Sequence, residues 1–247
     1  MSKAPIIHLG EHLLNERFLI SNIKRPFPQS RVTCEDVPGM RGTRVKERTM
    51  GTRSVTLTLS STSPSRDHGR MLDDMSMLTT WLFESDELNL SISDEGGRVR
   101  KVVLDGDIDF DEYEETGSVT IKLLQPDPLC IIGKPQTTKV PSGGSAKFNI
   151  AHAFPIISIS ASSAVRDGTT ELWGVRFDDG DYLHVELPTS NQSSVAIDCE
   201  RRSVLVNGAV SMVTIGSDWP ILAPGEHVVE MDKGSGAAEL TWQERCI

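Results

Sequence analysis

The chain has 247 residues, of which 38% are hydrophobic and 24% are charged, and its formal net charge is −10. This length fits two modest domains or one large domain. The acidic excess argues against a partner bound through its phosphates, and no apolar run approaches the ~20 residues of a membrane helix. The N-terminus shows no signal peptide, so we expect folding in a cytoplasm and no membrane insertion.

The first 60 residues are predicted to form strands and turns. Val55, Leu57 and Leu59 alternate with polar residues, which is the pattern of a half-buried strand. The segment "VPGMRGTR", residues 37–44, contains two glycines and a proline and is typical of turns. Residues 1–60 are also basic, with ten Lys or Arg against five Asp or Glu.

One helix is expected, over residues 67–83. Apolar residues recur along it at the spacing of a single helical face, so we expect this stripe to pack on a core. Its members are Met71, Met75, Leu78 and Leu82.

An acidic segment follows the helix: residues 84–115 contain twelve Asp or Glu against three Lys or Arg. Part of it, from Val102 to Phe110, is predicted to be a strand with apolar residues on one side and aspartates on the other. The aspartates are Asp105, Asp107, Asp109 and Asp111. Their spacing resembles the start of a calcium loop, but Phe110 stands where such a loop needs glycine, so we expect no calcium.

A domain boundary is predicted where three prolines, at positions 126, 128 and 135, interrupt the chain. We therefore expect a first domain of residues 1–128 and a second of residues 129–247. From about residue 146 the pattern is one of short strands separated by turn signals, which is typical of an antiparallel β-sandwich.

The end of the chain is predicted to form a hairpin. Pro224-Gly225 suits a type II turn, because proline fixes φ and glycine accepts a positive φ. The turn would join the apolar pair Ile221-Leu222 to a strand around residues 228–231. A further strand, with alternating apolar residues, is expected at 238–242.

No motif for catalysis or cofactor binding stands out. The four cysteines are far apart, and His8 and His12 flank a glycine in a strand-like segment. The glycine-rich "PSGGSAK" lacks the ending of a phosphate-binding loop. We therefore expect no catalytic residue, no cofactor and no bound metal.

A carbohydrate-binding module or a glycosidase-like protein that binds the host surface is the alternative function. It would use carboxylates at a turn, Asp178, Asp179 and Asp181, together with aromatic rings that stack on sugars. The aromatic candidates are Trp173, Tyr182, Trp219 and Trp242. Turn aspartates commonly cap the backbone and tryptophans commonly pack in a core, so we favour a structural function.

Several segments occur in a characteristic order along nearly the whole chain. In the N-terminal half they are "FLISNIKRP", "GTRVKERTMGTRSVTLTL", a helix ending in "LTTWL", "ELNLSISDEGGRVRKVVLDGDID" and "GSVTIKLLQPDP". In the C-terminal half they are "VAIDCERRSVLVNG" and "WPILAPGEHVVEM", followed by "AAELTWQERCI". This order resembles the distal tail protein family of long-tailed bacteriophages, although "EHVVE" departs from the asparagine that the family usually has before this strand.

The resemblance implies a mainly β fold with two β-sandwich domains, the first with one α-helix and the second galectin-like or jelly-roll. It implies a homohexameric ring, or hub, at the tip of the virion tail, assembled in the host cytoplasm. Such a ring joins the tail tube protein to the tail-associated or receptor-binding proteins, and contact with the tape measure protein is compatible with its position. DNA would pass through the ring only as transient cargo.

The opposed charges suggest where copies would meet. A cyclic ring needs two different faces that fit each other, and the basic and acidic segments supply opposite charges. The candidate subunit-interface residues are Arg41, Arg44, Lys46, Arg48, Asp107, Asp109 and Asp111. The same segments would otherwise be ordinary solvated faces.

Overall fold

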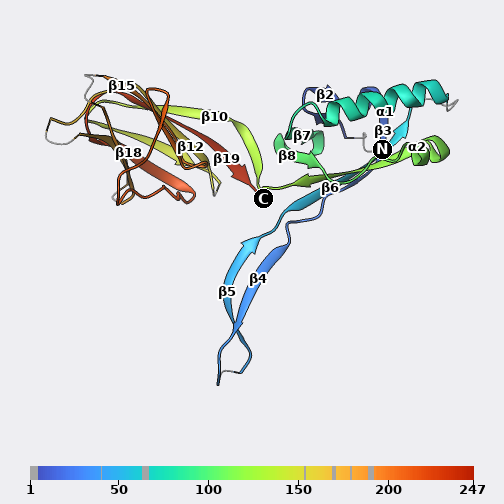
Figure 1. The fold of residues 1–247 in the computed structure, drawn as a ribbon, viewed down its shortest axis with the longest axis horizontal. Coiled ribbons are helices and arrows are strands. Elements are labelled where there is room, and N and C mark those ends of the chain that lie inside the picture. Colours follow the sequence, from blue (N-terminus) through green and yellow to red (C-terminus); the bar gives the residue numbers. More distant parts are fainter. Residues whose placement is uncertain are drawn as a thin grey trace. The chain divides into compact units, whose positions relative to one another are not determined.

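The computed structural model divides into two compact units. The first consists of Met1–Cys130 together with Ile247, and the second of Ile131–Cys246. Both are built mainly from strands, as the sequence predicts (Figure 1). The residues that the structure describes are 5–39, 41–62, 67–152, 154–168, 171–178, 180–188 and 192–247.

Antiparallel strands form the body of the first unit. They are β1 (Ile7–Leu9), β2 (His12–Leu13), β3 (Phe18–Lys24), β6 (Arg53–Ser61), β7 (Leu88–Ile92), β8 (Arg98–Leu104) and β9 (Ser118–Gln125). Strand β8 pairs with both β7 and β9. From β7 the pairing continues to β1 and β2, and from β9 it continues to β6 and β3.

Alternation decides which side of β6 is buried. Val55, Leu57 and Leu59 are at most 1% exposed, which confirms the predicted strand, and the residues between them are only half-buried. Strand β9 repeats the pattern opposite β6, so the two apolar rows lie together. Fully burying each such side chain contributes roughly 1.5–3 kcal/mol to folding.

Helix α1 (His68–Leu82) is the predicted helix. Asp67 caps it, because the Asp67 carboxylate accepts a hydrogen bond from the Arg70 amide at 3.0 Å. The whole predicted stripe is buried. Asp74 is buried beside it, 1% exposed and 3.7 Å from Arg17, and burial raises the pKa of this carboxyl. Neither helix in the described part of the chain is long and apolar enough to span a membrane.

A second helix replaces part of the predicted strand. Strand β8 ends at Leu104, and α2 (Phe110–Thr116) follows, so a strand extending to Phe110 is wrong and the first unit has more than one helix. The Asp109 carboxylate caps α2 by accepting from the Glu112 amide at 3.1 Å, and Gly117 ends it with φ of 73°. These end signals outweigh the alternation of aspartates.

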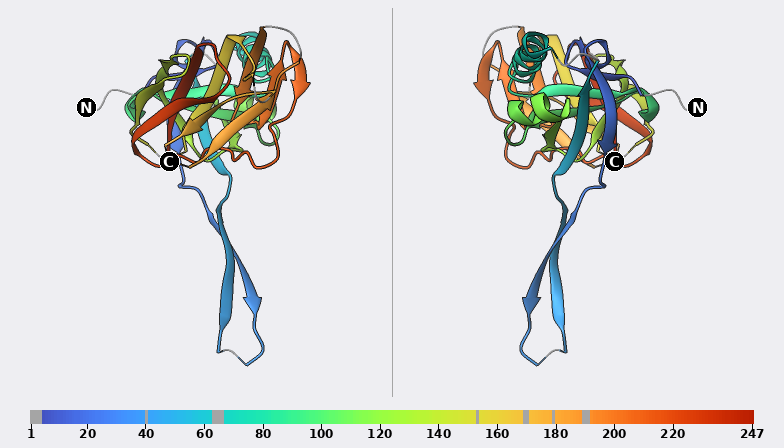
Figure 2. Two further views of the ribbon diagram at one scale, coloured as in Figure 1. Left: turned by 90° about the vertical axis from the view of Figure 1, so that its left-hand side faces the viewer. Right: turned by 90° about the vertical axis from the view of Figure 1, so that its right-hand side faces the viewer.

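A long hairpin extends from the first unit (Figures 1 and 2). Its strands are β4 (Ser30–Asp36) and β5 (Thr43–Met50), which pair only with each other. Every residue of both strands is exposed. We call this hairpin, residues 30–50, the arm. An isolated two-stranded hairpin is marginally stable in water, so a surface that packed against the arm would stabilise it.

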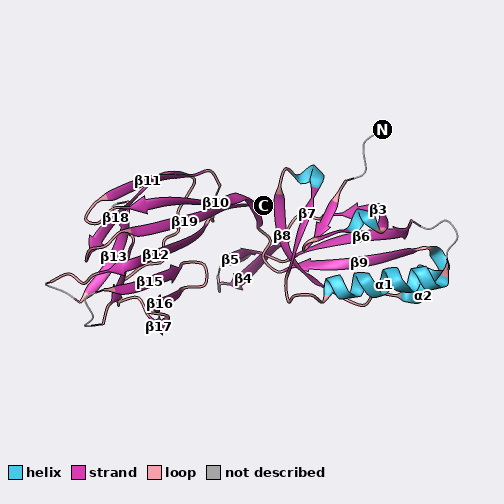
Figure 3. Ribbon diagram, turned by 90° about the horizontal axis from the view of Figure 1, so that it is seen from above, coloured by secondary structure: helices cyan, strands magenta, loops and turns pink. Residues whose placement is uncertain are grey.

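Two antiparallel sheets form the second unit, and no helix occurs in the part of it that is described (Figure 3). The strands are β10 (Cys130–Val140), β11 (Ser145–Ile150), β12 (Ile156–Ala164), β13 (Leu172–Phe177), β14 (Tyr182–Glu186), β15 (Ser193–Asp198), β16 (Ser203–Val206), β17 (Ala209–Ser211), β18 (Gly225–Lys233) and β19 (Ala238–Cys246). One sheet has the order β17-β16-β15-β12-β19-β10 and the other β11-β18-β13-β14. A shared core that includes Trp173, Phe177 and Leu240 lies between them.

The predicted C-terminal hairpin is wrong. Residues 219–223 form no strand, and β18 begins at Gly225, where φ is 145°. Strand β18 pairs with β11 and β13 in one sheet, whereas β19 pairs with β12 in the other. The chain therefore crosses between sheets here, and the choice of partner strands depends on the core rather than on the local turn.

His227 connects the segment before β18 to the sheet through two hydrogen bonds. Its ring nitrogens lie 2.8 Å from the Asp178 carboxylate and 2.7 Å from the carbonyl oxygen of Ala223. Both partners are acceptors, so the ring must donate from both nitrogens, and only the protonated form can do so. Burial alone lowers the pKa of His227, but these hydrogen bonds outweigh it and leave the pKa raised.

Replacing His227 with asparagine should therefore destabilise the chain more in acid than in alkali. A raised pKa in the folded state stabilises the fold fully below the unfolded pKa of about 6.5, and the stabilisation is lost as the pH rises through the folded value. Urea unfolding of both proteins at pH 5.5 and pH 8.5 measures the difference. A loss of stability that is equal at both pH values would contradict protonation of this ring.

Candidate assembly surface

The two faces of the arm differ in polarity. Residues that pair across two strands share a face. One face carries the pairs Ser30–Met50, Val32–Arg48, Cys34–Val45 and Asp36–Thr43. The other carries the polar pairs Arg31–Thr49, Thr33–Glu47 and Glu35–Arg44. We call the first the apolar face, defined by Val32, Cys34, Val45 and Met50.

The apolar face is open to solvent. Val32 is 50% exposed, Val45 58% and Met50 41%. Exposed apolar side chains that gather on one face are a feature of surfaces that bind other proteins.

A β-bulge keeps this face continuous. Thr33 pairs with Glu47 and Cys34 with Val45, so Lys46 is an extra residue in β5. Side chains alternate along a strand, so Val45 and Met50, five positions apart, would point to opposite faces without the bulge. The bulge turns Val45 to the side of Met50, so the apolar side chains of β5 lie on the same face as Val32 and Cys34 of β4.

A pocket of about 380 Å³ continues the apolar face at the base of the arm. Its lining residues are Phe27, Pro28, Ser30, Arg48, Thr49, Met50 and Ile247. Phe27 is 82% exposed and Ile247 57%. Since Met50 belongs to both features, apolar surface runs from the arm into the pocket.

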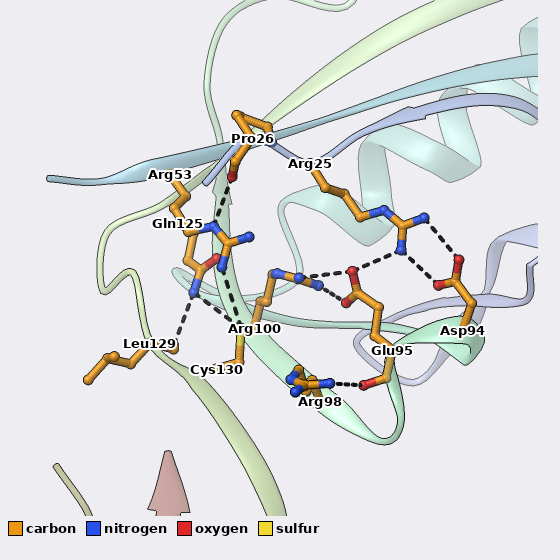
Figure 4. Close-up of polar contacts among 10 residues, drawn as sticks. All are labelled: Arg25, Pro26, Arg53, Asp94, Glu95, Arg98, Arg100, Gln125, Leu129 and Cys130. Carbon is orange, nitrogen blue, oxygen red and sulfur yellow. Dashed lines mark hydrogen bonds and ion pairs between the residues drawn. The ribbon is translucent and has the colours of Figure 1, made fainter. Parts of the chain in front are cut away.

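Two hydrogen bonds join the chain segments on either side of the arm, and the one between Arg53 and Pro26 is drawn in Figure 4. Arg53, 6% exposed at the start of β6, donates from Nε to the Pro26 carbonyl oxygen at 3.1 Å. The Gly51 amide donates to the Gln29 carbonyl oxygen at 2.7 Å. The segment that leads into the arm and the segment that leaves it are thus joined at the base.

A partly buried ion-pair network, with Arg100 at its buried end, lies beside this base (Figure 4). The Arg25 guanidinium binds Asp94 at 2.7 Å and Glu95 at 2.9 Å, and Arg100 donates two hydrogen bonds to Glu95. The Arg100 side chain is only 4% exposed. Burial by itself raises the pKa of Glu95, but the bonds from Arg100 and Arg25 outweigh it and lower the pKa below its usual range.

The candidate interface residues lie at two places in the first unit. Arg44, Lys46 and Arg48 are on β5 of the arm, and Arg41 is in the turn at its tip. The aspartates lie between β8 and the first turn of α2, where Asp109 caps the helix and all three are exposed. Four of the candidates therefore lie on the arm, and the charge pattern did not single out its apolar residues Val32, Val45 and Met50.

The residues considered for binding or cleaving a sugar are mostly buried or hydrogen-bonded to other residues of the chain. Trp173 is fully buried and Trp242 is 5% exposed, so neither can offer an open ring face for stacking. Asp178 accepts from His227 and from the Val228 amide, and Asp179 lies outside the described residues. Among the described residues, no group of three His, Cys, Asp or Glu could hold a metal ion.

Two protein-family models match the chain, and both describe phage tail proteins. Residues 7–125 match the family described as phage tail protein RIFT-related domain, and residues 151–246 match the siphovirus-type tail component, C-terminal domain. No curated protein sequence matches the chain significantly.

Solved structures show the same fold at low sequence identity. The Dit protein (gp 19.1) of phage SPP1, described as a hub of the adsorption apparatus, is 15% identical with a TM-score of 0.75, covering 99% of this chain and 100% of that one. A chain of the phage P2 baseplate in its activated conformation with calcium is 12% identical with a TM-score of 0.57, and 99% of each chain is covered.

Proposed function

Because the chain belongs to the siphophage distal tail protein family and is a structural protein of the tail rather than an enzyme, we propose that it forms a homohexameric ring at the tail tip. The ring would join the tail tube protein to the tail-associated or receptor-binding proteins. DNA would pass through its central channel. The first unit would form the ring, and the second would lie on its outside.

The observation that carries this proposal is the uncovered arm. Both of its strands are exposed, its flanking segments are hydrogen-bonded to each other at the base, and Val32, Val45 and Met50 lie on one face. In a cyclic ring one surface of each copy meets a different surface of the next, so an arm that reaches a neighbour satisfies the geometry of such a contact. A second copy would cover the apolar face and stabilise the hairpin.

The opposite charges of the arm and of residues 84–115 support a second copy of the same chain as the partner of the arm. Arm residues 30–50 carry five basic and three acidic residues, whereas residues 84–115 carry the acidic excess described above. Opposite charges on the two faces favour the correct orientation and speed association. The exposed aspartates beside α2 are the proposed contact for the basic side chains of β5.

Light scattering after size exclusion tests the proposal directly. A hub of this kind should elute at six times the chain mass of 27.1 kDa, and negative-stain images should show rings with a central hole. A particle that remains monomeric at high concentration and instead cleaves or binds glycans would favour the alternative, a host-surface binding protein.

Reversing the charge at Asp107 and Asp111, by substitution with lysine, should weaken the ring and reduce its sensitivity to salt. Asp109 is left intact because it caps α2. Exposed ion pairs each contribute about 0.2–1 kcal/mol and are screened by salt, so the effect should be largest at low ionic strength. Sedimentation of both proteins across a salt series measures it, and identical salt profiles would exclude these aspartates from the interface.

A further inference from the structure

Strand β17 forms one edge of a sheet in the second unit (Figure 3). Among the described strands it pairs only with β16, through a hairpin whose turn is Asn207-Gly208. Both turn residues have positive φ, 53° and 78°, as the favoured two-residue hairpin turns require. The residues that flank such a turn exchange two hydrogen bonds with each other. Val210, one position further on, therefore directs its backbone N–H and C=O away from β16.

The other end of this edge is held as well. Met212 follows β17, and Val213 forms an antiparallel bridge with Val185 of β14, which belongs to the other sheet. The segment 209–213 is thus fixed at one end by the hairpin and at the other by this bridge. A partner that paired with this segment would meet a backbone that is already ordered, so little loss of conformational freedom would oppose binding.

The side chains of this edge are apolar and open to solvent. Val210 is 87% exposed and Met212 is 81% exposed, and Ile215, in the turn that follows, is fully exposed. Val210 pairs with Leu205, which is 39% exposed, and alternation along the strand places Met212 on the same face. The edge of the sheet therefore continues into an apolar surface of the kind that binds other proteins.

The sequence carries no protection for this edge. Natural proteins commonly guard an edge strand with proline or with a charged side chain, often lysine, which prevents pairing with a further strand. Residues 203–216, "SVLVNGAVSMVTIG", contain neither a charged residue nor proline, although 24% of the whole chain is charged. An edge strand without such a guard is suited to accept an added strand.

Two arginines indicate which charge the added strand should carry at one end. Arg201 and Arg202 lie in the turn between β15 and β16 and are exposed, and Arg201 is 3.9 Å from Asp198. Val204, at the start of β16, pairs with Ser211, so this turn lies at the end of the sheet where β17 finishes. An acidic side chain at the matching end of an added strand would be attracted to the arginines.

We propose that β17 accepts an extended segment of another protein as an additional strand. Its backbone would hydrogen-bond to Val210, and its apolar side chains would pack on Leu205, Val210 and Met212. The segment would be apolar at alternate positions and acidic at the end near Arg202. This inference rests on the proposed function, because a hub that joins other proteins needs a surface for each of them, and it assigns one such surface to the second unit.

The test uses the full chain and a fluorescent, end-blocked hexapeptide of alternating threonine and valine with glutamate at one end. Fluorescence anisotropy should show saturable binding of this peptide. The same peptide methylated on every backbone nitrogen should not bind, because strand addition depends on backbone hydrogen bonds. Val210→Pro should bind the unmethylated peptide about tenfold more weakly, because proline removes the outward-facing N–H and with it one hydrogen bond.

Val210→Thr is the matched control. It keeps both the N–H and a β-branched side chain, so it should bind nearly as well as the original chain. Met212→Lys is a second variant, which places a charge on the apolar face without changing the pairing of β17, and it should also weaken binding. Thermal unfolding confirms that each variant is folded.

Three outcomes of the titration would overturn the inference. They are the absence of saturable binding at millimolar peptide, equal binding of the methylated peptide, and equal affinity in Val210→Pro and Val210→Thr. Light scattering on the same variants keeps the edge apart from the proposed ring. Loss of the ring in Val210→Pro and Met212→Lys would assign the edge to contacts between copies and overturn the inference, whereas peptide binding by a chain that never forms a ring removes only the ring.

Discussion

Replacing Val32 and Val45 together with aspartate is expected to leave the chain as a monomer of 27.1 kDa. Both valines lie on the apolar face, and burying each side chain against a neighbour would contribute roughly 1.5–3 kcal/mol. The aspartates would remove that contribution and place unpaired charges in a contact that must exclude water. A ring repeats the contact at every subunit, so the loss is multiplied around it.

The variant should fold normally, because the arm contributes nothing to the core of the first unit. Thermal unfolding checks this, and light scattering over a concentration series reports the ring. Thr33→Asp, compared with Val32→Asp alone, is the matched control, because it places the same single charge on the next residue of β4 but on the polar face. If the control breaks the ring as completely as the double variant, the distinction between the two faces is wrong.

Local patterns predict the regular elements of this protein well. The stripe of α1 and the alternation of β6 each place apolar residues on one side, and burying that side is the main source of stability for both elements. The mainly β character follows from the same patterns. The resemblance between segments, rather than any single motif, led to the tail protein family.

Features that depend on distant parts of the chain could not be predicted in this way. Asp74 has the ordinary position of a charged residue in a helix, yet it is 1% exposed. The extra residue Lys46 shifts the alternation of side chains in β5, so a search for apolar residues at every second position does not detect the apolar face of the arm. A bulge shows itself only once the partner strand is known.

The ion pairs at the base of the arm also could not be predicted from local sequence patterns. Arg25, Glu95 and Arg100 are separated along the chain and look like solvated charges. The pairing of β7 with β8 and the short 3-10 helix η2 (Ser93–Glu95) between them bring the three together. A charge count assigns Glu95 to an acidic surface, whereas the fold gives it a partly buried, structural position.

Glu95→Ala is accordingly expected to destabilise the first unit strongly. It removes the partner of Arg100, whose side chain is 4% exposed, and leaves a buried guanidinium without its carboxylate. Breaking a buried pair in this way costs about 3–5 kcal/mol. Urea unfolding monitored by circular dichroism should show the loss as a lower transition midpoint.

Two further variants distinguish the effect of breaking the Glu95–Arg100 pair from the effect of losing a negative charge in general. Asp94, whose side chain is 47% exposed, is the more exposed partner of Arg25. Asp94→Ala should therefore cost about 1 kcal/mol or less, because Arg25 keeps its bond to Glu95. Combining Glu95→Leu with Arg100→Met removes both buried charges and should restore much of the stability lost in Glu95→Ala. If the double variant is no more stable than Glu95→Ala, the unpaired guanidinium is not the cause of the loss.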